Sequence, residues 1–286
     1  MPRSLFVGLC TLDVIQLVEH VPGPNEKVTA LAQTIAAGGP AANAAAAFSH
    51  LGGRATLLTG IGGHPLAAGI TADLGALGVH IIDLNPDAAE PPTVSSILVT
   101  DSTGERAVAS VNATGIDLEP PQDLEELLEG VDSVEFDGHH MALAIHVAET
   151  ARNAGVPTVF DGGSWKPGTE KLLPLIDVAV CSADFRPPGA SSHEDVLRYL
   201  LASGVPRAAV SRGDAPILWT GPEGTGSVAV PQVEVADTLG AGDILHGALT
   251  YYLGLPFPEV LARAAEVATL ACASFGTRTW MVKAPG

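Results

Sequence analysis

The second half of the chain alternates strand-like and helix-like segments, and this alternation constrains the fold more than any other feature of the sequence. A tight turn at residues 221–224 also joins residues 216–220 and 227–231 as a hairpin. Such alternation predicts a mainly parallel sheet covered by helices, with ligands bound at the carboxyl ends of its strands. The expected strands are residues 133–136, 156–161, 177–181 and 208–211, and the expected helices are residues 141–154, 193–203, 241–253 and 257–273.

The N-terminal part of the chain departs from this pattern. Strand-like segments at residues 11–18, 27–35, 94–100 and 107–111 lack full helices between the members of each pair. The turn at residues 101–104 joins the last two as a hairpin. We therefore expect one domain over residues 1–286, with a small second sheet formed from about residues 11–35 and 92–112.

Composition places the chain among globular proteins. Of its 286 residues, 47% are hydrophobic and only 16% are charged, which argues against disorder and allows a substantial core. The apolar runs are interrupted before they reach a membrane-spanning length, and the N-terminus has no signal-peptide layout, so we expect a cytoplasmic protein. The three scattered cysteines are interpreted as reduced core residues.

The net charge of −18 at pH 7 bears on the partners of the protein. Binding to nucleic acid or to an anionic membrane needs clustered Lys and Arg, and this composition argues against both. An anionic nucleotide would have to be held by backbone amides, a metal ion and a few local arginines.

A turn of small residues, Gly240-Ala241-Gly242, precedes Asp243 and the apolar run 244–253. The glycines allow a tight turn, and the N–H groups at the positive end of a helix attract anions, above all phosphate. An acid in this place suits proton abstraction from a substrate hydroxyl while the amides stabilise a group in transfer. The pattern indicates phosphoryl transfer from a nucleotide, although an ordinary helix with a capping aspartate can begin in the same way.

The full run at residues 237–243, Asp-Thr-Leu-Gly-Ala-Gly-Asp, resembles the C-terminal signature of the ribokinase-like (PfkB) carbohydrate kinases, and ketohexokinase-like members in particular. The resemblance implies a three-layer α/β/α fold whose central sheet is mainly parallel, with a small β-sheet lid over the sugar. It implies Asp243 as catalytic base and the amides of Gly240, Ala241 and Gly242 as anion hole. It also implies ATP and Mg²⁺, and K⁺ as a monovalent cation that some members use.

The sugar end of the site is expected near the N-terminus. Gly38 and Gly39 precede a helix that we place from residue 44, and Asn43 offers a donor and an acceptor to hydroxyls. In the family, the matching asparagine and glycine amide hold the sugar, and an aspartate like Asp13 accepts hydrogen bonds from two sugar hydroxyls. Ordinary turns use the same residue types. Pro40 stands where ketohexokinases carry a polar residue, so one sugar contact is expected to differ.

The nucleotide end is expected to combine a lid residue with two turns. Arg106 ends the hairpin turn of the lid, where ketohexokinase-like members bring an arginine to the phosphates and where a solvated hairpin charge is the alternative. Ser211 and Gly213 resemble the nucleotide loop of the family. Gly276 resembles its second adenine-side turn, and it also suits a helix C-cap.

The family motif Asn-x-x-Glu, which organises the water shell of Mg²⁺, is altered here. The corresponding stretch reads Ser182-Ala183-Asp184-Phe185, so Phe185 replaces the glutamate and Asp184 stands one residue early. Asp184 is therefore the candidate for a water-mediated metal contact, a mode that suits Mg²⁺ because it retains several waters.

The sequence thus predicts an ATP-dependent carbohydrate kinase. A nucleoside kinase of adenosine type on the same fold, or an inactive sugar-binding regulatory homologue, stays open. The absence of Trp and Tyr from the lid segments favours a sugar over a base. A homodimer through the lid is also expected, because the apolar residues Val94, Ile97 and Val99 cannot all face the chain's own cleft.

Overall fold

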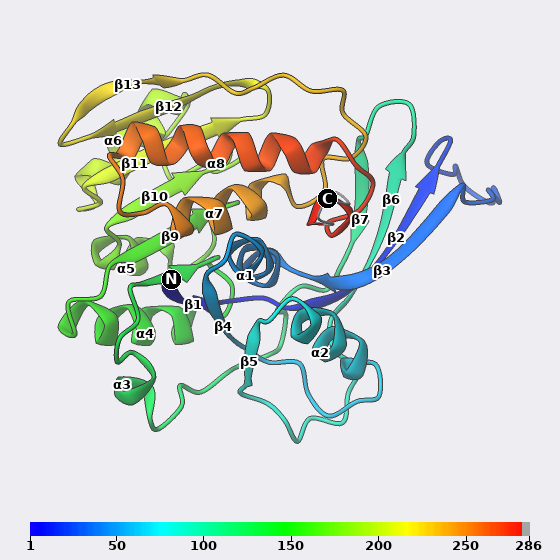
Figure 1. Ribbon diagram of the computed structural model, residues 1–286, viewed down its shortest axis with the longest axis horizontal. Helices are drawn as coiled ribbons and strands as arrows, with labels where there is room; N and C mark the ends of the chain where they lie inside the picture. Colours follow the sequence, from blue (N-terminus) through cyan, green and yellow to red (C-terminus); the bar gives the residue numbers. More distant parts are fainter. Residues whose placement is uncertain (282–286) are drawn as a thin grey trace.

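The computed structural model describes residues 1–281 and contains a nine-stranded main sheet (Figure 1). Its strand order is β13-β12-β11-β10-β9-β8-β1-β4-β5, in which the strands from β11 to β5 are parallel and β12 and β13 form an antiparallel edge. The main sheet confirms the expected architecture. Its strands are β1 (Arg3–Val7), β4 (Arg54–Thr59), β5 (His80–Asp83), β8 (Ser133–Phe136), β9 (Thr158–Gly162), β10 (Val178–Cys181), β11 (Arg207–Arg212), β12 (Ala215–Gly221) and β13 (Gly224–Val228).

Helices cover both faces of this sheet and complete three layers (Figure 1). Successive strand residues point to opposite faces, so Val7 packs into one core and its neighbour Phe6 into the other. The helices against the Val7 face are α3 (Leu124–Leu127), α4 (Met141–Asn153), α5 (Thr169–Leu172) and α6 (His193–Ala202), with the short 3₁₀ helix η1 (Leu173–Leu175). Those against the other face are α1 (Pro40–His50), α2 (Ala67–Ala76), α7 (Ala241–Tyr251) and α8 (Phe257–Cys272).

A separate four-stranded sheet stands at one edge of the molecule (Figure 1), and we call this sheet the lid. Its order is β3-β2-β6-β7, in which β2 is antiparallel to β3 and parallel to β6, and β6 and β7 form a hairpin. The four strands are β2 (Thr11–Val18), β3 (Ala32–Gly38), β6 (Val94–Thr100) and β7 (Arg106–Ala109).

The observed bounds differ most from the expected ones at three elements, β3, α1 and β13. The strand expected at residues 27–35 lies at Ala32–Gly38, because Thr11 pairs with Gly38 and extends β3 to the start of α1. That helix begins at Pro40 rather than at residue 44, since proline suits the first helical turn. The second strand of the C-terminal hairpin begins at Gly224, which makes the hairpin tighter than expected.

The inner face of the lid packs on its own chain. Ile15, Ile97 and Val99 are fully buried together, and the partly buried Leu239 and Phe275 pack against them. Val94 is partly buried against the core that α1 and α2 share, so the expectation that the chain itself could not cover Val94, Ile97 and Val99 was wrong. The physical reason is that the segment before α7, with Leu239, and the segment after α8, with Phe275, pack against the lid and supply the missing apolar cover.

Within residues 1–281, no helix is both long and apolar enough to cross a membrane. The three cysteines carry free thiols, and Cys10 and Cys181 are buried in the core, as expected from their apolar surroundings.

Candidate active site

The candidate site is centred on a contact between the first turns of α1 and α7. Asn43 Nδ2 donates a hydrogen bond to Asp243 Oδ2 over 2.8 Å, although the two residues are 200 positions apart in the sequence. The helices approach this closely because Gly247 has no side chain, and a methyl group there would overlap the carbonyl oxygen of Ala44. Small residues therefore bring the two expected halves of the site together.

Asp13 brings a second carboxylate to the same place. Its Oδ1 accepts a hydrogen bond from Thr11 Oγ1 at 2.6 Å, and the side chain lies directly over Gly38, where a methyl group would overlap the carboxylate. Burial raises the pKa of Asp13, hydrogen bonds from Thr11 and Ser95 oppose the rise, and the nearby charge of Asp243 adds to it. Gly38 is thus required by the position of Asp13.

The turn before Asp243 has the geometry of an anion site. Gly240 has a φ of 71°, in the left-handed region, and caps α7. Its carbonyl accepts from the N–H of Ile244 at 2.8 Å, whereas the N–H of Ala241 donates to the carbonyl of Thr238 over 3.3 Å. The N–H groups of Gly240 and Gly242 have no hydrogen-bond partner within residues 1–281. Two amides at the positive end of an eleven-residue helix are therefore available to an anion.

The charge state of Asp243 depends on several neighbours. Burial raises the pKa of its carboxyl group, while the hydrogen bond from Asn43 and the positive charges of His246 and Arg106 lower it. The same hydrogen bond and charges favour the ionised form that a general base needs.

The segment that leads into the turn contacts two of the expected residues, Gly276 and Arg106. Asp237 is buried, and its two carboxylate oxygens accept hydrogen bonds from the N–H groups of Leu239, at 2.8 Å, and Gly276, at 2.9 Å. Arg106 of the lid donates to Thr238 Oγ1 over 3.1 Å. Gly276 and Arg106 therefore both contact the segment that carries the turn.

The remaining expected nucleotide and metal residues lie at the carboxyl edge of the main sheet. Ser211 lies near the carboxyl end of β11, and its hydroxyl donates a hydrogen bond to the carbonyl of Cys181 over 3.4 Å. Gly213 follows in the turn after this strand, with a φ of 63°. Asp184 follows β10 and is exposed. None of these three residues contacts Asp243. They lie beside one another at the same carboxyl edge of the main sheet, at the ends of β10 and β11.

The surroundings of Asp184 determine whether it can hold Mg²⁺. No group of three or more His, Cys, Asp or Glu side chains within residues 1–281 is placed to ligate a metal directly. The Asp184 carboxylate has no partner among the described residues, because only its N–H is engaged, by Ser182 Oγ at 3.1 Å. Phe185 is fully buried against Phe160 and Trp165 and offers no ligand. One free carboxylate fits a water-mediated site.

Arg278 is a site residue that the sequence did not reveal. Its guanidinium donates to Asn43 Oδ1 at 2.9 Å, to the carbonyl of Ala37 at 2.7 Å and to Asp73 at 3.1 Å. The acceptor oxygen of Asn43 must therefore face Arg278, and its donor nitrogen must face Asp243. The only signal in the sequence was that Arg278 is one of just 14 basic residues.

Asp137 also escaped the sequence analysis. It follows β8 and accepts hydrogen bonds from the N–H groups of Leu9, Ala41 and His139, at 2.8, 3.2 and 2.8 Å. One buried carboxylate thus joins the end of β1, the start of α1 and the start of α4. An aspartate followed by glycine at a strand end was its only mark in the sequence.

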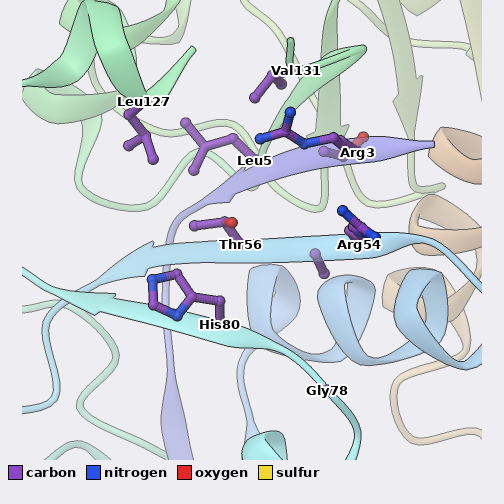
Figure 2. Close-up of a pocket in the computed structure, with 10 residues that line it drawn as sticks. Arg3, Leu5, Arg54, Thr56, Gly78, His80, Leu127 and Val131 are labelled. Carbon is purple, nitrogen blue, oxygen red and sulfur yellow. The ribbon is translucent and has the colours of Figure 1, made fainter. Parts of the chain in front are cut away.

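A cavity of about 320 Å³ lies away from all of these residues (Figure 2). Arg3, Arg54 and His80 line it, and each begins one of the strands β1, β4 and β5. The cavity therefore opens at the amino ends of the strands, opposite the edge that carries Asp243, and takes no part in the candidate site.

Comparison with known proteins shows the family of the chain. The model of the pfkB family carbohydrate kinases matches residues 1–284. The chain belongs to this family. The ATP-dependent ribose-1-phosphate kinase of Halopiger xanaduensis is 29% identical over 246 residues, which make up 85% of this chain and 82% of that protein.

Two solved structures share the fold. A candidate ribokinase from Agrobacterium tumefaciens superposes with a TM-score of 0.86 at 28% identity, over 98% of this chain and 94% of that chain. The Arabidopsis thaliana ribokinase complexed with ribose and ATP superposes with a TM-score of 0.80 at 24% identity, over 96% of this chain and 93% of that chain. The kinase therefore has the ribokinase-like fold, with the smaller separate sheet.

Proposed function

We propose that this carbohydrate kinase transfers the γ-phosphate of ATP to a hydroxymethyl group of an unphosphorylated sugar, with Asp243 as general base. The ATP-dependent ribose-1-phosphate kinase supports ATP as the donor. The observation that carries the assignment of the base is the 2.8 Å hydrogen bond between Asn43 and Asp243, next to two free amides at the start of α7. A base, a sugar-binding amide and an anion site thus occupy one place.

In the proposed reaction, Asp243 takes the proton of the attacking hydroxyl as its oxygen bonds to the γ-phosphorus. The bond from phosphorus to the β,γ-bridging oxygen breaks, and ADP leaves with that oxygen. The amides of Gly240 and Gly242 stabilise the charge on the transferred group, and Ala241 joins them when its N–H releases Thr238. Asn43 and Asp13 hold the other sugar hydroxyls, and a glycine amide of the pair Gly38 and Gly39 adds a donor.

The nucleotide is proposed to lie between the lid and the carboxyl edge of the main sheet. Arg106 contributes a guanidinium to the phosphates, and Ser211, Gly213 and Gly276 form the turns beside the rest of the nucleotide. Mg²⁺, when bound, would supply positive charge that neutralises the phosphates, and Asp184 would hold it through its water shell. Dependence on K⁺ is tested by assaying with and without a monovalent cation.

The charge at the sugar end supports a neutral substrate. Asp13 and Asp243 both face this end, and the positive charge of Arg278 is offset by Asp73 at 3.1 Å. A phosphate on the sugar would therefore approach the carboxylates of Asp13 and Asp243, while the guanidinium of Arg278 is already paired with a carboxylate. We therefore expect ribose and other free sugars to be preferred over ribose 1-phosphate.

A panel of substrates tests the proposal directly. ATP consumption is measured with free pentoses and hexoses, their phosphates and adenosine, at fixed Mg²⁺ and K⁺. Turnover of a free sugar supports the proposal, whereas preference for adenosine assigns a nucleoside kinase. Binding of a sugar without ATP consumption assigns an inactive sugar-binding homologue, a reading to which the altered magnesium motif around Phe185 lends some weight.

The Asp243→Asn variant tests the base. We expect kcat to fall by about 10²–10⁴-fold, because a general base contributes about that much, with the KM values for sugar and ATP nearly unchanged. Steady-state kinetics of both proteins give the comparison. Retention of more than about a tenth of kcat would remove Asp243 from this role, since that loss lies below the stated range.

A further inference from the structure

His246 follows the proposed base, Asp243, by three residues in the same helix, α7. The side chain is buried, with only 2% of the residue exposed. Its Nδ1 lies 2.8 Å from the carbonyl oxygen of Gly242, and its Nε2 lies 2.9 Å from the carbonyl oxygen of Val180 in β10. The carboxylate of Asp161, at the end of β9, stands 3.4 Å from Nδ1.

The chemistry of these partners determines the protonation of the ring. A carbonyl oxygen can only accept a hydrogen bond, and a neutral imidazole carries a single N–H. With a carbonyl oxygen against each nitrogen, a neutral ring would turn a bare lone pair toward one buried carbonyl. The geometry therefore favours a ring in which both nitrogens donate, with the carboxylate of Asp161 at 3.4 Å as its counter-charge.

The two hydrogen bonds connect the turn of the active site to the main sheet. The carbonyl of Gly242 belongs to the peptide that leads into Asp243, and Val180 lies inside the sheet. A movement of the first turn of α7 would stretch the bond to Gly242, whereas the bond to Val180 holds the ring in place.

On the basis of the proposed function, we propose that His246 is a positioning residue for the phosphoryl transfer. As a buried imidazolium paired with Asp161, it clamps the first turn of α7 to β10, so that the carboxylate of Asp243 and the amides beside it keep their reactive geometry. The same side chain also places a fixed positive charge near the carboxylate of Asp243.

The charged groups around the pair are consistent with this role. Asp161 is surrounded by Asp243 and Asp137, which add negative charge, and by Lys166, which opposes it. Burial raises the pKa of Asp161, and the His246 charge works against that rise. The same charge lowers the pKa of Asp243. Without His246, three carboxylates would share this buried region with less compensation.

The protonation state is tested by ¹⁵N NMR of the histidine side chains in the whole protein. The His246→Gln variant identifies the resonances, because only they should disappear. We expect an imidazolium signature with two protonated nitrogens in wild type at pH 7, and its conversion to the neutral form in the Asp161→Asn variant. A neutral ring in wild type at pH 7 would overturn the proposal. This measurement needs no substrate, so it stands apart from the outcome for Asp243.

Kinetics then test the positioning role. We expect His246→Gln to lower kcat by about 10²-fold, as small displacements in an active site can, with both KM values within about twofold of wild type. The acid limb of the kcat profile should also move to higher pH. The control is His146→Gln, which changes an exposed histidine of α4 and should leave kcat and the profile unchanged.

The outcomes separate positioning from mere packing. Thermal unfolding shows whether His246→Gln is folded. If it is folded and the pH profile stays in place, or both KM values rise together with the fall in kcat, the positioning role is wrong. If it does not fold, the kinetics of Asp161→Asn decide: wild-type kcat and profile would overturn the proposal, and a lower kcat with a shifted limb would support it. If Asp243→Asn retains activity, the proposed function fails separately.

Discussion

Asn43 shows how charged neighbours orient a single amide at the proposed sugar end of the site. Arg278 can only donate, so it faces Oδ1, and the carboxylate of Asp243 can only accept, so it faces Nδ2. The amide is thereby held ready before any substrate is bound. A side chain held in this way loses little freedom on binding, which favours affinity.

We expect Asp13→Ala and Asn43→Ala to raise the KM for the sugar strongly and the KM for ATP little. Each loses hydrogen bonds to hydroxyls worth about 0.5–1.5 kcal/mol, and more where the partner is charged. For Asn43→Ala, loss of the hydrogen bond that lowers the pKa of Asp243 should also shift the acid limb of kcat/KM to higher pH. Initial rates over pH 5 to 8 check both effects. Equal changes in the two KM values would mean that the halves of the cleft are misassigned.

Glu135 offers a test of stability rather than activity. It lies in β8, is fully buried, and neither carboxyl oxygen has a hydrogen-bond partner among residues 1–281. Burial raises the pKa of its carboxyl well above the usual range, and the nearby Asp161, Asp137 and Asp243 add to the rise. Since the folded state holds this proton more tightly than the unfolded state, the group destabilises the fold increasingly as pH rises above its unfolded pKa of about 4.3.

We therefore expect Glu135→Met to raise Tm relative to wild type, by more at pH 8 than at pH 4.5, because methionine is apolar and of similar length. Thermal unfolding at the two pH values measures the difference. Glu126→Met, at an exposed position of α3, serves as control and should show no such growth with pH. A gain in Tm that is the same at both pH values would contradict the assignment of a protonated carboxyl.

At the scale of elements, the start of α7 determines the geometry of the proposed anion site. Gly240 adopts a backbone conformation that other residues enter at a cost of about 1–2 kcal/mol. A methyl group there would also lie 3.1 Å from Thr277 Cγ2 and 3.4 Å from Asn43 Nδ2. The turn therefore has little room to change without moving Asn43.

We expect Gly240→Ala to lower kcat more than it raises either KM, since the amides and Asn43 are displaced together. Gly75→Ala, inside α2, is the matched control and should keep wild-type kinetics, because among residues 1–281 no atom beyond its chain neighbours and its own helix backbone lies within 4 Å of the added methyl. Steady-state rates with saturating ATP provide the measurement. Wild-type kcat in folded Gly240→Ala would show that this turn tolerates displacement and would weaken its assignment as anion hole.

At the scale of the whole molecule, the two faces of the lid have different surroundings. Its inner face is covered by the chain's own Leu239 and Phe275. Its outer face carries Val14, Ile35 and Leu98. Val14 pairs with Ile35 across the strands, Leu98 points to the same face of the sheet, and Ile35 is 55% exposed. We propose that a second copy covers this outer face in a homodimer with two-fold symmetry.

We expect Ile35→Lys to weaken this dimer, because a charge would replace an exposed apolar side chain in the interface. Since the net charge of −18 opposes association, wild type should dimerise more tightly as salt is added. Light scattering at low and moderate salt measures the mass of both proteins. A monomer mass for wild type at both salt concentrations would show that the proposed dimer does not form.

The sequence by itself determined the fold class and the local signature of the site. Strand and helix periodicities are local properties, so the alternation from residue 133 onward predicted the parallel sheet, and the spacing in Gly240-Ala241-Gly242-Asp243 predicted a helix start with free amides. The resemblance of residues 237–243 to the carbohydrate kinases then extended to the whole chain, and family membership confirmed it.

Only the tertiary structure decided which distant groups meet. Arg278 orients Asn43, Asp137 joins three chain segments, and His246 of α7 contacts β10. No short-range sequence pattern predicts contacts of this kind. The cover of Ile97 and Val99 was decided in the same way, because it comes from residues more than 130 positions away. A sequence pattern reports the preferences of neighbouring residues, whereas the protonation and orientation of a buried group depend on whichever acceptors and charges the packed elements bring against it.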